Sequence, residues 1–110
     1  MANPTNVLWI MGARQSGRTT TLLNMLEAHG EDNSIVITPS RDQGLLLKEH
    51  AREKNITKGV YLTPLSRFNG LGKNRTFFVD GWEQLSPKIK SDLECYIHQG
   101  CRFYITHCTE

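Results

Sequence analysis

Segments typical of strands and segments typical of helices alternate along this chain, and this alternation restricts its fold more than any other feature. Short apolar runs rich in strand-forming residues are followed by stretches whose apolar residues recur at helical spacing. Strands joined through helices pair in parallel, because the helix carries the chain back to the starting end of the sheet. The sequence therefore predicts an α/β domain of three layers with a mostly parallel sheet of four or five strands.

The limits of these segments come from turn and capping residues. Ser40 with Gln43 forms a capping box, and Ser86 before Pro87 is typical of another helix start. In the second helix we expect Leu45, Leu46 and Ala51 to face the core. Strands are predicted at residues 7–11, 34–38, 60–63, 76–80 and 102–106, and helices at 17–29, about 41–54 and from 87 to just before 100.

Size and composition agree with one folded domain over residues 1–110. Hydrophobic residues make up 38% of the chain and charged residues 22%, with a formal net charge of +2. No apolar run approaches the roughly 20 residues that span a bilayer, and the start does not resemble a secretory signal. These features predict a cytoplasmic protein that does not contact a membrane.

The three cysteines, Cys95, Cys101 and Cys108, are an odd number, which favours free thiols in a reducing compartment. A zinc site could be drawn from them together with His98 and His107. However, Cys95 and His98 fall within a predicted helix, whereas paired zinc ligands usually lie on a tight turn. We therefore expect thiols rather than a zinc site.

Residues 12–20, with the sequence GARQSGRTT, follow a predicted strand and open a predicted helix, as a phosphate-binding loop does. Gly12 and Gly17 allow a tight turn in which backbone N–H groups approach an anion. The start of the helix directs further N–H groups and a positive dipole to the same place. The candidate phosphate-binding residues are Gly12, Ala13, Arg14, Gln15, Ser16, Gly17, Arg18, Thr19 and Thr20.

This segment resembles the Walker A motif of P-loop NTPases, G-x-x-x-x-G-K-[ST]. Every fixed position matches except the lysine, which is Arg18 here. Arginine is longer than lysine and planar, so it presents its charge differently to terminal phosphates. The resemblance implies ATP or another nucleoside triphosphate as the ligand, with Mg²⁺ held by the hydroxyl of Thr19. A glycine-rich turn without a ligand is the alternative.

The strand over residues 76–80 ends in Asp80 and resembles a Walker B motif. The resemblance implies that the Asp80 carboxylate binds Mg²⁺ beside the phosphate loop; alternatively, it only caps the turn that follows. In the helicase and AAA-type branch of P-loop NTPases, the next residue is often a second acid that orients the attacking water. Gly81 stands there instead, and Glu83 is the candidate base.

The strand over residues 102–106 provides a third match to this branch. The corresponding strand lies between the two motif strands and carries a polar sensor, a position held here by Thr106 or His107. Residues 35–41, IVITPSR, are also similar to a stretch of helicases and viral DNA-packaging ATPases, which suits a phage or mobile-element protein. The resemblance covers about residues 7–107 and makes Asp80, Glu83 and Thr106 the candidate catalytic residues.

Two functions fit these motifs. The first is a small P-loop protein that binds ATP and Mg²⁺ and hydrolyses ATP slowly or only with a partner. The second is a degenerate P-loop domain that serves as a non-catalytic binding or regulatory module for a larger protein or a nucleic-acid motor. Thr19 and Asp80 favour the first function, whereas Arg18 and Gly81 favour the second.

Partners are predicted from three features. P-loop domains of this branch have a further strand beside the phosphate-loop strand, which this sequence lacks, so residues 7–11 are expected at a sheet edge. A free edge favours a homo-oligomer or a larger protein partner. Residues 67–75, RFNGLGKNR, combine basic groups with an aromatic ring, as nucleic-acid-binding segments do, although an ordinary solvated loop also fits. Trp82 is either a core anchor or an exposed contact for a partner.

Overall fold

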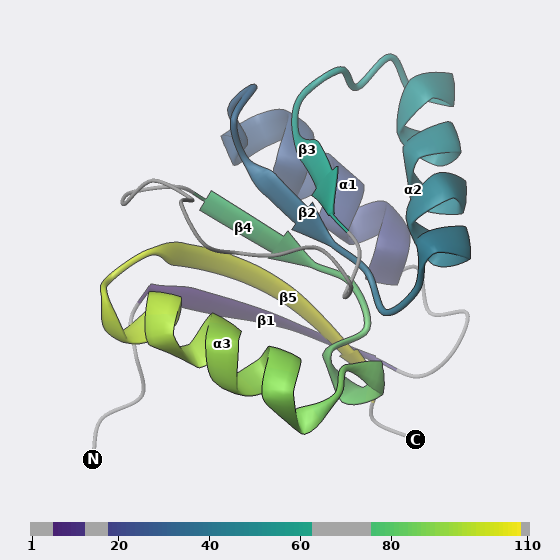
Figure 1. Ribbon diagram of the computed structural model, residues 1–110. Coiled ribbons are helices and arrows are strands. Elements are labelled where there is room, and N and C mark those ends of the chain that lie inside the picture. The colour runs from purple at the N-terminus through teal and green to yellow at the C-terminus, as the bar shows by residue number, and fades with distance from the viewer. Residues whose placement is uncertain (1–5, 13–17, 63–75, 109–110) are drawn as a thin grey trace.

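A five-stranded parallel sheet forms the centre of the molecule (Figure 1). The computed structural model describes residues 6–12, 18–62 and 76–108, and the statements below refer to these residues. The sheet has the strand order β1-β5-β4-β2-β3. Its strands are β1 (Val7–Gly12), β2 (Ile35–Ile37), β3 (Val60–Leu62), β4 (Thr76–Val79) and β5 (Arg102–Cys108); the helices are α1 (Arg18–His29), α2 (Arg41–Glu53), the 3₁₀ helix η1 (Trp82–Gln84) and α3 (Pro87–His98).

Helices cover both faces of the sheet, which confirms the predicted three-layer α/β architecture. Strand residues alternate between the two faces, so Phe77 and Phe103 join the core under α3 and η1. Phe78 and Tyr104 join the core under α1 and α2. Rings also stack along each face, with centroids 4.6 Å apart for Phe77 and Phe103 and 4.8 Å apart for Phe78 and Tyr104.

The helices begin at the residues that the sequence indicates. The hydroxyl oxygen of Ser40 accepts from the backbone N–H of Gln43, and that of Ser86 accepts from the N–H of Ile89. Each bond satisfies one of the amides that a helix start leaves without an intrahelical partner. The 3₁₀ helix η1 was not predicted, and it buries Trp82, which is therefore a core anchor rather than an exposed contact.

The prediction for the buried face of α2 was wrong at two positions. Leu45 and Leu46 are 58% and 60% exposed, whereas Leu47 is 2% exposed. The buried stripe of this helix consists of Gly44, Leu47 and Ala51. A Cβ at Gly44 would lie 2.9 Å from the Thr38 hydroxyl oxygen, so the missing side chain lets α2 approach the end of β2 closely. This approach fixes which of the three consecutive leucines points inward.

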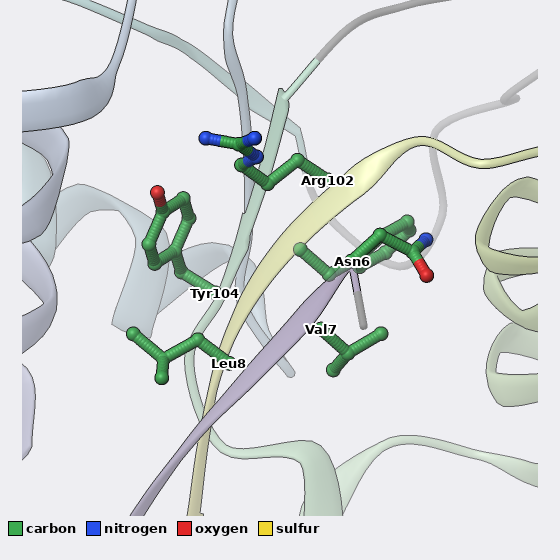
Figure 2. A pocket seen from close by; sticks show the side chains of 6 residues that line it. Asn6, Val7, Leu8, Arg102 and Tyr104 are labelled. Atoms are coloured by element: carbon green, nitrogen blue, oxygen red, sulfur yellow. The ribbon is translucent and has the colours of Figure 1, made fainter. Parts of the chain in front are cut away.

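Strand β1 lies at one edge of the sheet and β5 lies between β1 and β4, as predicted. Leu8, Trp9 and Met11 of this edge strand are 44%, 45% and 55% exposed. Trp9 packs edge-on against Trp82 with ring centroids 5.7 Å apart, which joins β1 to the layer that η1 and α3 form. Asn6 lies at the amino end of the strand, beside Val7 (Figure 2). Its side-chain amide donates to the carbonyl oxygen of Ile97 (3.0 Å) and to that of Cys101.

Candidate nucleotide site

The candidate site lies where β1, β4 and β5 end, at the carboxyl edge of the parallel sheet. Ligands of open α/β sheets bind at this edge, because the loops that leave the strands open a crevice there. Strand β1 ends at Gly12 and helix α1 begins at Arg18, so the predicted phosphate loop joins the edge strand to a helix start. Asp80 follows β4 directly, and its backbone N–H donates to the carbonyl oxygen of Ile37 (2.9 Å).

Asp80 and Thr106 form the tightest polar contact of the site. The Thr106 hydroxyl donates to carboxylate oxygen Oδ1 of Asp80 over 2.7 Å, and it accepts from the backbone N–H of Gly81 over 2.8 Å. The Thr106 side chain is fully buried. Its one proton and an acceptor lone pair are therefore both used to hold the turn after β4 against β5.

Thr19 reaches the same carboxylate from the first turn of α1. Its hydroxyl oxygen lies 3.5 Å from Oδ2 of Asp80, the carboxylate oxygen that Thr106 does not use. The three residues come from different elements and are separated by 61 and 26 positions along the chain. The fold therefore brings together a hydroxyl, a carboxylate and a buried hydroxyl that the motifs single out.

Glu83 lies on η1, next to the ends of β1 and β5. Its carboxylate oxygen Oε1 accepts from the backbone N–H of Cys108 over 2.9 Å. Cys108 is in register with Gly12, the last residue before the predicted phosphate loop. The bond therefore holds the Glu83 carboxylate at the point where that loop begins.

Gly81 gives the chain the turn that places η1. Its φ of 78° lies in the left-handed region, which residues with a Cβ adopt at a cost. A Cβ there would also lie 3.1 Å from Cγ of Pro39. The Asp-Gly pair at the end of a strand is itself a turn signal. That signal could have identified the role of Gly81, which sequence analysis treated only as a missing acid.

Several predicted site residues are placed and others lie outside the described residues. Gly12 ends β1, Arg18 begins α1, Thr19 is half-buried and Thr20 is exposed. The remaining loop residues, Ala13, Arg14, Gln15, Ser16 and Gly17, fall outside the part that the structure describes, as do residues 67–75.

The cysteines do not gather in the part of the chain that the structure describes. Cys95 is exposed, Cys101 is buried and Cys108 is intermediate. No group of three or more His, Cys, Asp or Glu side chains suited to a metal ion occurs among the described residues. A metal at the candidate site would therefore take hydroxyl, ligand and water oxygens besides the Asp80 carboxylate.

No known protein family, curated protein or solved structure matches this chain. Within the described residues, every helix is too short or too polar to cross a membrane. The interpretation of the site therefore depends on its own residues and geometry.

Proposed function

We propose that the protein binds ATP, or another nucleoside triphosphate, with Mg²⁺ at the carboxyl edge of the sheet. In this proposal, residues 12–20 hold the phosphates and the side chains of Thr19 and Asp80 hold the metal. Thr106 positions Asp80. We further propose that the chain alone hydrolyses the nucleotide slowly, or only when a partner completes the site.

The convergence of Thr19, Asp80 and Thr106 is the observation that carries this proposal. Their contacts of 3.5 and 2.7 Å join the start of α1, the end of β4 and the end of β5. These are the positions at which the resemblance to P-loop NTPases requires a hydroxyl, a carboxylate and a polar sensor. A turn without a ligand has no need of that combination.

The donor set fits Mg²⁺, which prefers oxygen ligands. Neighbouring ligands of one Mg²⁺ lie about 3 Å apart and opposite ligands about 4 Å apart, given bond lengths of ~2.1 Å. The separation of 3.5 Å between the Thr19 hydroxyl and Oδ2 of Asp80 exceeds that of neighbouring ligands by about 0.5 Å, so a small shift of either side chain would let both bind one ion. When bound, the ion neutralises charge on the phosphates, and the chain's part is to orient both oxygens.

Three features support slow hydrolysis. Arg18 replaces the compact lysine that reaches the terminal phosphates, and Gly81 takes the place of a second acid. Oxygen Oε1 of Glu83 already accepts from Cys108. Its other oxygen, Oε2, accepts from the side-chain amide of Gln84 over 3.2 Å. As a general base, Glu83 would therefore have to give up or share one of these bonds.

The bond between Glu83 and Cys108 also favours the second candidate function, a non-catalytic binding or regulatory module. It gives the acid a structural role that needs no reaction. In this form the fold would bind a nucleotide, or no ligand, and serve a larger protein or a nucleic-acid motor. Nucleic-acid binding by residues 67–75 stays a prediction.

Calorimetric titration with ATP and Mg²⁺, run beside a phosphate-release assay, tests the proposal. The variant Asp80→Asn keeps the shape of the side chain and an acceptor for Thr106 but removes the charge. Asp32→Asn, in an exposed turn before β2, is the matched control.

We expect Asp80→Asn to weaken Mg²⁺-dependent binding by about 10- to 100-fold, which corresponds to a charged interaction of about 1.5–3 kcal/mol. Binding by Asp32→Asn should equal that of the wild type. Absence of nucleotide binding by the wild type at millimolar concentration would contradict the first function. Binding without phosphate release, even with added partner, would favour the second.

We also infer that another chain covers the free edge of β1. The edge strand is uncharged, and its exposed side chains Leu8, Trp9 and Met11 are apolar. An edge with free backbone groups and apolar side chains is a template for pairing. A second copy of this chain and a larger protein partner are the two candidates.

A further inference from the structure

A cavity between α2 and β3 lies at the end of the sheet opposite the candidate nucleotide site. Its volume is about 310 Å³, at the lower end of ligand pockets, and α2, β3 and the segment between them line it. Helix α2 starts at the carboxyl edge of the sheet and runs to the other end, where this segment turns back into β3 (Figure 1). The cavity is therefore separate from Thr19 and Asp80.

The charged residues that line this cavity are all basic: Lys48, Arg52 and Lys58. Lys58 is held in place, because its Nζ donates to the carbonyl oxygen of Glu27 at the end of α1 over 2.7 Å. Arg52 pairs with Glu49 over 2.9 Å on the outside of α2, and this acid does not line the cavity. Lys48 and Lys58 therefore supply the positive charge of the cavity, because the charge of Arg52 is already paired.

Helix α2 ends at this cavity, and the carbonyl groups of a helix end would repel an anion. Here two of these carbonyl groups already accept hydrogen bonds from backbone N–H groups. The carbonyl oxygen of Ala51 accepts from the N–H groups of Lys54 (3.1 Å) and Ile56 (2.8 Å), and that of Arg52 accepts from Asn55 (3.0 Å). Asn55 has a φ of 61°, the left-handed turn that makes these bonds possible. The turn therefore shields the negative end of the helix.

The rest of the wall is largely apolar and includes one unusual polar group. Ala51, Ile56 and the ring of Tyr61 supply apolar surface. The hydroxyl of Tyr61 is buried and has no hydrogen-bond partner among the described residues. Burial raises the pKa of this phenol above its usual range, so it remains a hydrogen-bond donor at neutral pH. Because this hydroxyl is covered, the ring of Tyr61 and not its oxygen faces a molecule in the cavity.

We propose that this cavity binds a small organic anion. The apolar body of the ligand lies against Ala51, Ile56 and the Tyr61 ring, and its carboxylate or phosphate group faces Lys48 and Lys58. The proposal is independent of the nucleotide site.

Two-dimensional ¹H–¹⁵N NMR titration of the full chain tests this site with three probes. They are 2-naphthoate, the uncharged 2-naphthylmethanol and inorganic phosphate. We expect 2-naphthoate to shift the amides of residues 51–61 saturably. Each of the other two probes should bind at least about tenfold more weakly, because the alcohol lacks the negative charge and phosphate lacks the apolar ring. Equal binding of the alcohol would overturn the proposal, as would shifts spread over the whole chain.

Two variants and a control locate the interaction. Lys48→Gln should weaken 2-naphthoate binding by about two- to fivefold, the range for an exposed charge. Lys54→Gln changes an exposed lysine that does not line the cavity and should leave binding unchanged. Lys58→Gln removes the other free charge of the cavity wall and should weaken binding by a factor similar to that of Lys48→Gln. Equal affinities for all three variants and the wild type would refute this site, whatever the result with ATP.

Discussion

Thr106 is the residue on which the geometry of the candidate nucleotide site depends most. Its buried hydroxyl joins the N–H of Gly81 to the carboxylate of Asp80, through bonds of 2.8 and 2.7 Å. The N–H of Gly81 is buried and has no water as an alternative partner unless the structure opens, whereas Asp80 is only partly buried. Thr106 therefore holds the candidate metal-binding acid and the turn after it in one arrangement.

Replacement of Thr106 by valine keeps the volume and removes the hydroxyl. We expect Thr106→Val to lower the free energy of unfolding by about 1–3 kcal/mol, because a buried N–H loses its partner. Urea denaturation monitored by tryptophan fluorescence measures the change. Thr106→Ser, which keeps the hydroxyl, should lose less, and a valine variant as stable as the wild type would show that the bond to Gly81 is dispensable.

Glu83 can be assigned to a structural or a chemical role by two substitutions. Glu83→Gln keeps an oxygen for the N–H of Cys108, so its stability should stay within about 0.5 kcal/mol of the wild type. Glu83→Ala removes that oxygen and should cost about 1–3 kcal/mol. If phosphate release occurs and Glu83→Gln abolishes it while the fold stays intact, Glu83 acts as the base.

Sequence motifs identified Thr19, Asp80 and Thr106 because each stands at a fixed position next to a strand or helix end. They did not reveal what Glu83 contacts. Its partner is a backbone N–H at the end of β5, 25 residues away, and no side-chain pattern records such a bond. Gly81 was noticed only as a missing acid, although its left-handed φ is what turns the chain into η1.

At the scale of elements, α2 shows how packing overrides local periodicity. We expect Leu47→Ala to destabilise the fold by about 2–5 kcal/mol, because it leaves a cavity in the core. Leu46→Ala, one residue earlier, should change stability by less than about 0.5 kcal/mol, since Leu46 is exposed. Thermal and urea unfolding of both variants measure the difference. A similar loss for both would restore the original prediction that Leu46 faces the core.

The sequence predicted every strand and α-helix of the described residues because these depend on local signals. Ser40, Ser86 and Pro87 mark helix starts, and the strands are apolar runs that alternate between two buried faces. The orientation of α2 could not be predicted in the same way, because three consecutive leucines fit several helix faces. The close approach of Gly44 to Thr38 decides between them, and it is a tertiary contact.

At the scale of the whole molecule, we expect the β1 edge of the sheet, and not the β3 edge, to pair with another chain. We expect light scattering across a concentration series to show a mass above that of one chain if a second copy covers β1. Met11→Lys adds charge to this edge and should shift the equilibrium toward the monomer. Val60→Lys changes another exposed apolar position, on β3 at the opposite edge, and is the matched control. Equal effects of both variants would exclude β1 as the self-association surface.

The strand order was predicted in part, for β1 at the edge and for β5 beside it. The P-loop resemblance placed the 102–106 strand between the two motif strands, and β5 lies there. Family membership does not follow from strand order, because many functions share one fold. For this reason, the function is proposed from the site and not from the sheet.

The bond from Thr106 to Oδ1 has a consequence for the choice of metal. Because Thr106 takes one lone pair of Oδ1, Oδ2, the oxygen that lies near Thr19, is the one that Asp80 offers more freely to a cation. Ca²⁺ often takes both oxygens of one carboxylate in a large and variable shell, whereas Mg²⁺ needs six closely spaced ligands in octahedral array. Discrimination against calcium would then come from a hydroxyl that touches no ion, because its bond makes two-oxygen binding by Asp80 less favourable.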